Sequence, residues 1–437
     1  DLHSFPTRRS SDLWQMLFLA LALLIGVLPV SAQATEITWW AFPTFATVDD
    51  TVGKYEQSVI DAFQAANPDI TVKLEMIDFQ SGPEKIATAI EGGTAPDVLF
   101  DAPGRIIDYG KNGKLATLDD LFTDEYKADI ANENIIGACS DGEHYYMYPF
   151  STFPFVMAYN KTLLEKEGLL DLVNLEGDRT WTTEKFTELN TALAEKGVMG
   201  PIVFCQAQGG DQGTRAFIQN LYSAQMLNPE MTEWTLNSEA GIKAMQYVVD
   251  EVNAGHLTEG ITYAGTPAIE AFVAGTVSGT LLWTPANAKN HAATLEENGI
   301  EVIAMPYPSD DETPDLEYYV GGFAVFNNGD DAKIEAAKKF IQFLADDKVV
   351  GPQNVLASNA FPVRTSFGDL YPGNEEMKFY ASLTKYYSPY YNTIDGFAGM
   401  RPAWWSNLQA ALTGEKTAEQ AMNDFVTDAN KAYADAQ

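Results

Sequence analysis

The sequence predicts an α/β fold built as two lobes. The first observation is an alternation of strand and helix patterns over residues 36–100, which favours a mainly parallel sheet covered by helices. The second is the length of 437 residues, which exceeds one typical domain of about 100–200 residues. The third is that no repeat or low-complexity linker divides the chain. Two lobes joined by several strands therefore fit better than two separate domains.

The first third of the chain carries the α/β pattern. Runs of β-branched and aromatic residues, or alternating apolar and polar residues, predict strands at 36–42, 70–76 and 97–100. Between these strands, apolar residues at helical spacing predict helices at 52–66 and 84–91. A strand–helix–strand–helix–strand order is what a mainly parallel sheet requires.

The middle of the chain opens with an aromatic segment, 145–159, which Pro149 and Pro154 interrupt. We interpret this segment as a strand pair or as a crossover between lobes. Thr182 suits the N-cap of a helix that ends at Lys196-Gly197. Further helices are predicted at 237–254, 267–274, 331–346, 375–386 and 415–434, and short strands at 201–205, 278–283, 300–304 and 318–326.

Residues 17–30 form an apolar run that fits an export signal. A bilayer-spanning helix needs about 20 apolar residues, whereas the core of a signal peptide needs about 7–15. Ala32-Gln33-Ala34 follows with a small-x-small cleavage pattern, so we expect residues 1–34 to be a leader cleaved after Ala34. A short membrane anchor is the alternative. No Cys follows the run, so we expect a periplasmic or secreted protein without a lipid anchor. Residues 1–13 resemble a translated vector scar, and the natural start could be Met16.

Composition excludes several classes of protein. The 61 acidic and 27 basic residues give a net charge of −34, which opposes binding to nucleic acid or to an anionic membrane. Two cysteines exclude a disulfide framework; Cys139 and Cys205 could pair in an oxidising compartment or remain two buried free thiols. The four histidines show no metal-ligand spacing. We therefore expect no metal, no cofactor and no nucleic-acid partner.

Several segments in a fixed order resemble a known family. They are 62–70, 89–98, 113–115 with 118–119, 148–169, Thr180-Trp181 with its following helix, 271–275, Met305-Pro306, Gly321-Gly322, 337–344 and 361–363. Together they resemble the extracellular solute-binding proteins of ATP-binding-cassette (ABC) importers, in the sugar-binding class that includes maltose- and glycerol-phosphate-binding proteins. Each motif is short, but the ordered match covers nearly all of 35–437.

The resemblance implies the two-lobed periplasmic-binding-protein fold, with a hinge and a ligand cleft between two α/β lobes. It implies that the chain crosses between lobes near 149–153, 265–275 and 318–325. Ligand would lie at the carboxyl ends of strands, and a monomeric closed form would deliver it to the transmembrane subunits of a permease. Lobe one would comprise 35–149 and 271–320, and lobe two 150–270 and 321–437.

Aromatic side chains are the first candidate ligand contacts, because a flat ring suits the C–H face of a sugar. Trp39 and Trp40 are neighbours on one strand and point to opposite faces. One is expected in the core, whereas Trp40, with Phe42 at the strand end, is a candidate to stack on ligand. Trp283 ends a predicted strand and is expected to be exposed there as a second stacking surface. Phe79 is a further candidate.

Polar candidates follow a predicted strand and lie on the predicted crossover. Asp101 and Arg105 follow the strand at 97–100, and they fall on positions that contact sugar in the maltose-binding relatives. A helix cap with a surface ion pair is the alternative. Ser151 and Thr152 resemble ligand contacts of the glycerol-phosphate-binding members. Phe153 departs from the acidic residue of maltose-type members, which argues against a maltodextrin ligand.

The later candidates combine an arginine with glycines. Gly321-Gly322 match a glycine pair where the backbone approaches ligand, or they serve as a hinge. Arg401 stands twelve residues before Thr413-Gly414, as does a ligand-binding arginine of the glycerol-phosphate class. Its donors suit diols, carboxylates or phosphates, and a salt bridge to a nearby acid is the alternative. Trp404 or Trp405 could stack beside it.

These observations predict an extracytoplasmic binding component that holds a mono- or oligosaccharide in the interlobe cleft. The alternative is sn-glycerol-3-phosphate or a glycerophosphodiester in the same fold. A secreted carbohydrate-active enzyme is a further alternative. The chain has no G-x-S-x-G, H-E-x-x-H, P-loop or G-x-G-x-x-G motif, although its many carboxylates leave a glycosidase pair open. We expect no catalytic activity.

Overall fold

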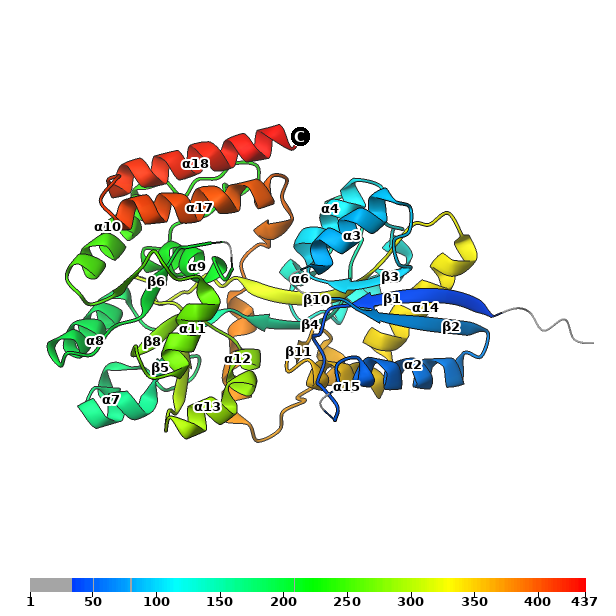
Figure 1. Ribbon diagram of the computed structural model, residues 1–437, viewed down its shortest axis with the longest axis horizontal. Coiled ribbons are helices and arrows are strands. Elements are labelled where there is room, and N and C mark those ends of the chain that lie inside the picture. Colours follow the sequence, from blue (N-terminus) through cyan, green and yellow to red (C-terminus); the bar gives the residue numbers. More distant parts are fainter. Residues whose placement is uncertain (1–33, 50, 79–80, 208) are drawn as a thin grey trace, which may run out of the picture.

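The computed structural model describes residues 34–49, 51–78, 81–207 and 209–437. These residues form two lobes that lie side by side and are joined by strands running between them (Figure 1). The predicted leader up to residue 33 and the candidate Phe79 lie outside the described residues. Among the helices that are described, none is long and apolar enough to cross a membrane.

Lobe one is built on a mixed six-stranded sheet with the order β11-β4-β10-β3-β1-β2. Strands β1, β2 and β3 are parallel, whereas β10 runs antiparallel to both β3 and β4. The strands are β1 (Thr35–Ala41), β2 (Ile70–Met76), β3 (Val98–Asp101), β4 (Tyr148–Pro154), β10 (Tyr318–Val325) and β11 (Phe361–Pro362). The helices are α2 (Lys54–Ala66), α3 (Gly82–Glu91), α4 (Pro103–Lys111), α5 (Asp124–Ala128), α6 (Glu133–Gly137), α14 (Asp331–Asp346) and α15 (Val350–Ala357).

Lobe two holds an antiparallel sheet of order β8-β5-β9 and a parallel pair, β6 and β7. Helices surround both sheets (Figure 1). The strands are β5 (Val156–Asn160), β6 (Ile202–Phe204), β7 (Thr258–Gly260), β8 (Gly279–Trp283) and β9 (Val302–Met305). The helices are α7 (Lys161–Glu167), α8 (Thr183–Glu195), α9 (Gln212–Leu221), α10 (Glu239–Asn253), α11 (Gly265–Val273), α12 (Pro285–Asn290), α13 (Ala292–Glu297), α16 (Glu375–Ser382), α17 (Phe397–Leu412) and α18 (Ala418–Asp435).

Each lobe has its own hydrophobic core, and the two cores divide the chain differently from the predicted boundaries. Residues of 271–316 were assigned to lobe one, but Phe272, Trp283 and Met305 lie in the core of lobe two, because β8 and β9 pair with β5. Residues 321–357 were assigned to lobe two, but β10, α14 and α15 pack in lobe one, because β10 fills the gap between β3 and β4.

Two of the three predicted crossings lie close to observed connections. The chain leaves lobe one between β4 and β5 and returns at the start of β10. A hydrogen bond joins these two connections: the Phe155 N–H donates to the Glu317 carbonyl oxygen at 3.0 Å. A further segment runs alongside, where the Leu316 N–H donates to the Tyr386 carbonyl oxygen at 2.8 Å. The crossing predicted at 265–275 is wrong, because the apolar face of α11 packs in the core of lobe two.

The cysteines do not pair. Cys139 and Cys205 are free and buried, and they belong to the cores of lobe one and lobe two respectively. Burial raises the pKa of the Cys205 thiol to about 12. Both residues therefore act as small apolar core side chains.

Candidate functional site: the interlobe cleft

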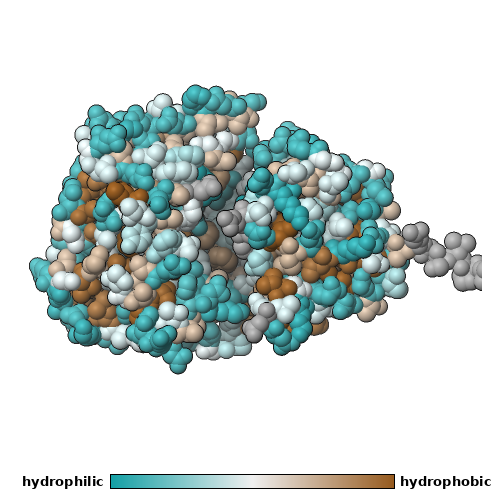
Figure 2. Space-filling view, in the orientation of Figure 1, coloured by the Kyte–Doolittle hydropathy of each residue, from teal (hydrophilic) through white to brown (hydrophobic). Residues whose placement is uncertain are grey.

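A cavity of about 630 Å³ lies between the lobes, where the surface of the molecule is hollowed (Figure 2). Lobe one supplies the segments that follow β1 and β3, at 42–47 and 100–105, and the end of α15 at 357–359. Lobe two closes the cavity with α12. Because β1 and β3 are parallel, their carboxyl ends meet at one sheet edge, which is where α/β proteins commonly bind ligands. We call this cavity the aromatic chamber, after Phe42, Phe45, Phe100, Phe153 and Tyr319 in its lining.

A second cavity of about 630 Å³ continues the cleft between α3 and α4 of lobe one and the segment 390–401. We call it the charged chamber, because Arg105, Asp108, Lys111, Asp395 and Arg401 line it. Ala102 and Arg105 line both chambers. Arg105 therefore stands where the two halves of the cleft meet.

Asp101 and Arg105 form a planar ion pair at the end of β3. Asp101 is the last residue of the strand and is 4% exposed, and α4 begins two residues later, which brings Arg105 back over the carboxylate. Arg105 Nε and Nη2 lie 2.7 and 2.5 Å from the two carboxylate oxygens, and the Ala102 N–H donates to Oδ1 at 2.7 Å. Burial raises the pKa of Asp101, although Arg105 opposes the rise.

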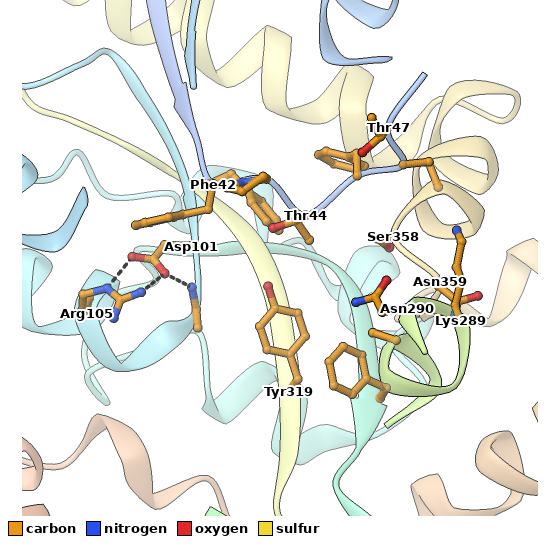
Figure 3. A pocket seen from close by; sticks show the side chains of 18 residues that line it. Phe42, Thr44, Thr47, Asp101, Arg105, Lys289, Asn290, Tyr319, Ser358 and Asn359 are labelled. Atoms are coloured by element: carbon orange, nitrogen blue, oxygen red, sulfur yellow. Dashed lines mark hydrogen bonds and ion pairs between the residues drawn. The ribbon is translucent and has the colours of Figure 1, made fainter. Parts of the chain in front are cut away.

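The floor of the aromatic chamber is a pair of stacked rings. Phe153 of β4 and Tyr319 of β10 have ring centroids 4.8 Å apart and an interplanar angle of 20°. Figure 3 places Tyr319 between the Asp101–Arg105 pair on one side and Asn290 and Asn359 on the other. Neither ring was predicted as a contact, although Phe153 was noted as a departure from the maltose-type pattern.

Phe42 extends this aromatic surface toward the ion pair. Its side chain is 1% exposed, and its ring centroid lies 5.5 Å from the guanidinium carbon of Arg105. Of the candidates named from the sequence, Phe42, Asp101 and Arg105 line the aromatic chamber. They come together because all three follow the carboxyl ends of neighbouring parallel strands.

The two lobes touch on both sides of the cleft. Asn359 of lobe one donates through Nδ2 to the Pro285 carbonyl oxygen at the start of α12, at 2.6 Å. On the other side, Lys111 Nζ lies 2.6 Å from Asp395 Oδ1 and 3.0 Å from the Thr393 carbonyl oxygen. These contacts bridge the lobes on either side of the cleft.

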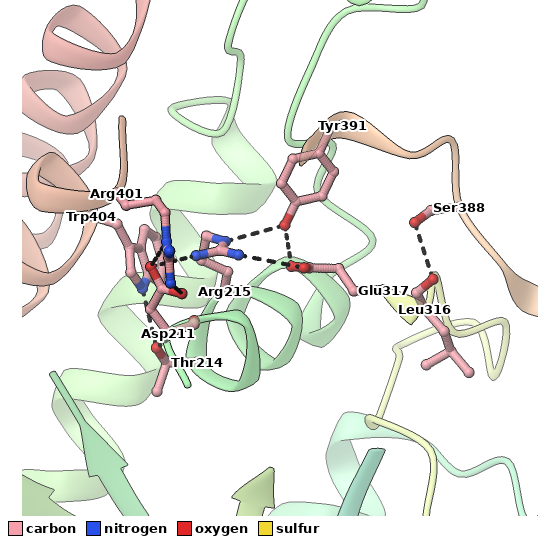
Figure 4. A network of polar contacts seen from close by, with 9 residues as sticks. All are labelled: Asp211, Thr214, Arg215, Leu316, Glu317, Ser388, Tyr391, Arg401 and Trp404. Carbon is pink, nitrogen blue, oxygen red and sulfur yellow. Dashed lines mark hydrogen bonds and ion pairs between the residues drawn. The ribbon is translucent and has the colours of Figure 1, made fainter. Parts of the chain in front are cut away.

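Arg401 lines the charged chamber and is also held by an acid (Figure 4). Its Nε and Nη2 lie 2.9 and 2.7 Å from the carboxylate oxygens of Asp211, and its side chain is 26% exposed. Asp211 also lies 2.7 Å from Arg215 Nη1. Both interpretations of Arg401 thus have structural support: it forms a salt bridge and it faces the cleft.

The three tryptophan candidates lie in the cores, outside both chambers. Trp40 is 9% exposed and lies beneath Lys85, whose Nζ is 4.7 Å from the ring centroid. Trp404 is 1% exposed, and its indole N–H donates to Thr214 Oγ1 at 3.1 Å. Trp283 is 1% exposed, so the expected exposure at the strand end is wrong; α11 covers β8 there, with Phe272 packed edge-on at 5.5 Å.

The crossover candidates are engaged within the sheet of lobe one. Thr152 Oγ1 lies 2.7 Å from the Tyr319 carbonyl oxygen, and Ser151 is 0% exposed. The β10 ladder shifts register between Gly321 and Gly322. A Cβ on Gly322 would lie 2.6 Å from the Tyr148 carbonyl oxygen, and one on Gly321 would lie 2.8 Å from Ser151 Oγ. The glycines are therefore required by the close approach of β4, and all four residues lie outside the lining of the two chambers.

Two α/β lobes, connected by paired strands and enclosing a cavity at strand ends, define a hinged binding protein. A family model for bacterial extracellular solute-binding proteins matches residues 48–350. The chain belongs to this family. Among the described residues, no cluster of three or more His, Cys, Asp or Glu side chains could hold a metal ion.

Similar sequences and structures agree with this assignment. A binding protein of Brucella abortus (strain 2308) is 31% identical over 156 residues, which is 36% of this chain and 36% of that protein. An uncharacterised lipoprotein of Streptomyces antibioticus is 29% identical over 137 residues, 31% of this chain and 30% of that protein. The chain therefore aligns with about a third of the length of these curated relatives.

Solved structures match the whole fold at low sequence identity. The cyclic α-maltosyl-1,6-maltose binding protein from Arthrobacter globiformis has a TM-score of 0.76 and 19% identity. The GacH receptor of Streptomyces glaucescens, solved unliganded and with acarbose, has a TM-score of 0.73 and 19% identity. A Thermotoga lettingae ABC transporter solute-binding protein bound with α-D-tagatose has a TM-score of 0.72 and 16% identity. Each match covers 92% of this chain and 100% of the other chain.

Proposed function

We propose that the protein binds a carbohydrate in the interlobe cleft and delivers it to the transmembrane subunits of an ABC importer. The observation that carries the proposal is the stacked Phe153–Tyr319 pair beside the Asp101–Arg105 ion pair. An aromatic face packs on the C–H face of a sugar ring, while a carboxylate and a guanidinium respectively accept from and donate to its hydroxyl groups. The sugars bound by the structural neighbours support the same class of ligand.

The shape of the cleft favours an oligosaccharide over a single sugar. Single ligand pockets commonly measure about 300–1,000 Å³, and here two chambers of about 630 Å³ each share Ala102 and Arg105 in their linings. We propose that one ring stacks in the aromatic chamber and that further rings extend into the charged chamber.

The ion pairs of the charged chamber favour a neutral ligand over glycerol phosphate there. The charged chamber presents Arg105, Lys111 and Arg401, but each is paired with a carboxylate, from Asp101, Asp395 and Asp211 respectively. An incoming phosphate would have to compete with these acids for the same donors. Hydroxyl groups can instead bond to both members of each pair.

The proposal also includes how the protein is exported and in what form it acts. We propose that the leader ending at Ala34 directs the chain out of the cytoplasm, that no lipid anchor holds it, and that it acts as a monomer without catalysing a reaction and without binding nucleic acid. The family description as extracellular and the net charge of −34 support this.

Calorimetric titration with maltose, maltotriose, acarbose, tagatose and sn-glycerol-3-phosphate tests the proposal. We expect at least one neutral saccharide to bind and to raise the melting temperature. No tryptophan is among the described residues that line the two chambers, so heat is a better readout than tryptophan emission. Binding of glycerol phosphate alone would favour the alternative ligand, and a panel of saccharides without any binding would contradict the proposal.

Arg105→Ala should weaken saccharide binding by about 10–100-fold, because a hydrogen bond to a charged group contributes about 1.5–3 kcal/mol. Arg179→Ala is a matched control: Arg179 pairs with Glu376 at 2.9 Å and lies outside the lining of both chambers. The control should bind as the wild type does. Equal affinities for all three proteins would mean that Arg105 does not contact the ligand.

The interlobe ion pair of Lys111 and Asp395 should favour the closed state. Each side chain is more than a quarter exposed, so the pair contributes about 0.2–1 kcal/mol. Lys111→Met and Asp395→Asn should therefore each weaken saccharide binding by no more than about fivefold. Both variants break the same ion pair, and Lys111→Met also removes the bond to the Thr393 carbonyl oxygen, so the losses in the double variant should be less than additive. Additive losses in titrations would instead indicate separate contacts with the ligand.

A further inference from the structure

A third cavity, of about 460 Å³, is lined largely by residues of lobe two. It is bounded by the end of α9 at Gln219, by the loop 225–235, by Asp315 shortly before β10, and by the segment 388–391. Among the described residues, none lines both this cavity and the aromatic or the charged chamber. We call it the rear pocket.

The walls of the rear pocket are mostly apolar. Methionine side chains are flexible and polarisable, so they adapt to ligands of different shape. The hydroxyl group of Tyr391 bonds to Glu317 and to Arg215 Nε at 3.2 Å. The ring of Tyr391, and not its hydroxyl group, is therefore available for contact with a ligand. The apolar lining consists of Met226, Leu227, Pro229, Met231, Pro389 and Tyr391.

Two of the polar side chains that line the rear pocket, Gln219 and Asp315, offer acceptors; Gln225, Asn228, Thr235 and Ser388 also line it. Gln219 is 3% exposed; its Nε2 donates to Asp315 Oδ2 at 2.8 Å, but its buried Oε1 has no hydrogen-bond partner among the described residues. A buried acceptor without a partner is unfavourable, so a ligand donor would gain by reaching it. Asn220 holds the backbone of Asp315 through two hydrogen bonds, at 2.6 and 2.9 Å, which fixes the position of the carboxylate.

The charged side chain in the lining of the rear pocket is acidic. Among the described residues that line the rear pocket, Asp315 is the one acid, and none is Lys, Arg or His. Burial raises the pKa of Asp315 to about 6, so its carboxylate is mainly ionised at neutral pH. An ionised carboxylate and an amide oxygen, without a cation beside them, complement a positively charged hydrogen-bond donor.

We propose that the rear pocket binds a compact organic cation, a primary ammonium group carried on an apolar or aromatic body. The ammonium donates to Gln219 Oε1 and to the Asp315 carboxylate. The apolar body packs on Met226, Met231 and the ring of Tyr391. This site is independent of the carbohydrate proposal, because the two regions share no residues.

Titration of the full chain with three small molecules of similar shape, which differ in one functional group, tests the site. Phenethylamine carries the ammonium, 2-phenylethanol replaces it with a neutral hydroxyl group, and phenylacetate replaces it with an anion. We expect the amine to bind at least tenfold more tightly than the alcohol, and phenylacetate to bind more weakly than either. Equal affinities, or no binding of the amine at about 10 mM, would overturn the proposal.

Two isosteric variants locate the binding. Asp315→Asn removes the charge and Gln219→Met removes the orphan acceptor, so each should weaken amine binding by tenfold or more. Arg105→Ala in the cleft is the control and should leave amine binding unchanged. Binding that survives both rear-pocket variants but is lost in Arg105→Ala would place the amine in the cleft and refute the site.

If a variant does not fold, a measurement on the wild-type protein tests the site instead. The methyl groups of Met226 and Met231 can be followed by carbon-13 NMR after methionine labelling. The amine should shift these two resonances at the concentrations that saturate the calorimetric signal. Shifts confined to other methionines would show that the amine binds elsewhere.

Discussion

Asp211→Ala should lower the free energy of unfolding by about 3–5 kcal/mol, which is the usual effect of removing one partner from a buried ion pair. Asp211 and Arg215 are each 1% exposed. The Asp211 carboxylate receives two hydrogen bonds from Arg401 and lies 2.7 Å from Arg215 Nη1, a contact that is electrostatic because Nη1 is not aimed for a hydrogen bond. After the substitution, Arg215 keeps its ion pair with Glu317, in which Nη2 lies 3.4 Å from Oε2.

The network of Asp211, Arg215, Glu317 and Tyr391 joins α9 to the strand that returns to lobe one (Figure 4). Its loss should therefore also loosen the connection between lobes. Asp120→Ala is a suitable control: Asp120 is 56% exposed and pairs with Lys338 at 2.7 Å, and exposed pairs contribute about 0–1 kcal/mol. Urea unfolding of the two variants compares them directly. Similar losses would mean that burial does not strengthen the Asp211 contacts.

Trp283→Ala should lower the free energy of unfolding by about 3–5 kcal/mol, as large-to-small substitutions of buried tryptophan do. Trp283 is 1% exposed and packs edge-on against Phe272 in the core of lobe two. Because Trp283 does not line either chamber of the cleft, the molecules that remain folded should bind saccharide as the wild type does.

A ligand-stacking role for Trp283, which the sequence suggested, requires the opposite result: weaker binding with little loss of stability. Denaturant unfolding and titration below the melting temperature separate the two outcomes. Trp405→Ala provides a comparison, since Trp405 is only partly buried against the same core. It should lose less stability than Trp283→Ala.

Local patterns predicted much of the secondary structure. The strand at 70–76 and the helix at 331–346 have the expected bounds, and Thr182 caps α8 through the Lys185 N–H as expected. Helices α9 and α17 were not predicted. All residues from Gly213 to Leu221 are buried, and they include Arg215, Gln219 and Asn220, so α9 lacks the solvent-exposed polar face of an ordinary surface helix. In α17, Pro402 lies inside the helix, where proline is normally unfavourable.

The division into lobes could not be read from local patterns. It depends on β10 pairing with β3 and β4, and on β8 and β9 pairing with β5. These pairings join residues that are far apart in the sequence, and a buried strand carries the same apolar signal whichever sheet it enters.

For the candidate site as well, the sequence identified some residues and missed others. Phe42, Asp101 and Arg105 were identified because ligands lie at the carboxyl ends of parallel strands, and all three line the aromatic chamber. Trp40, Trp283 and Trp404 were chosen largely by residue type, which does not distinguish a core aromatic from a stacking surface. Phe153 and Tyr319 were missed, because their stacking depends on β4 and β10 being neighbours.

The position of β10 also sets an order of assembly. During synthesis, β1 to β4 emerge first, but the sheet of lobe one lacks its inner strand until residues 318–325 follow. The intervening chain, 156–316, contains every described strand of the sheets of lobe two. Lobe two can therefore gather these strands while β3 and β4 still expose unpaired edges to the solvent. Such late, long-range pairing slows folding and leaves the nascent chain open to association with other chains.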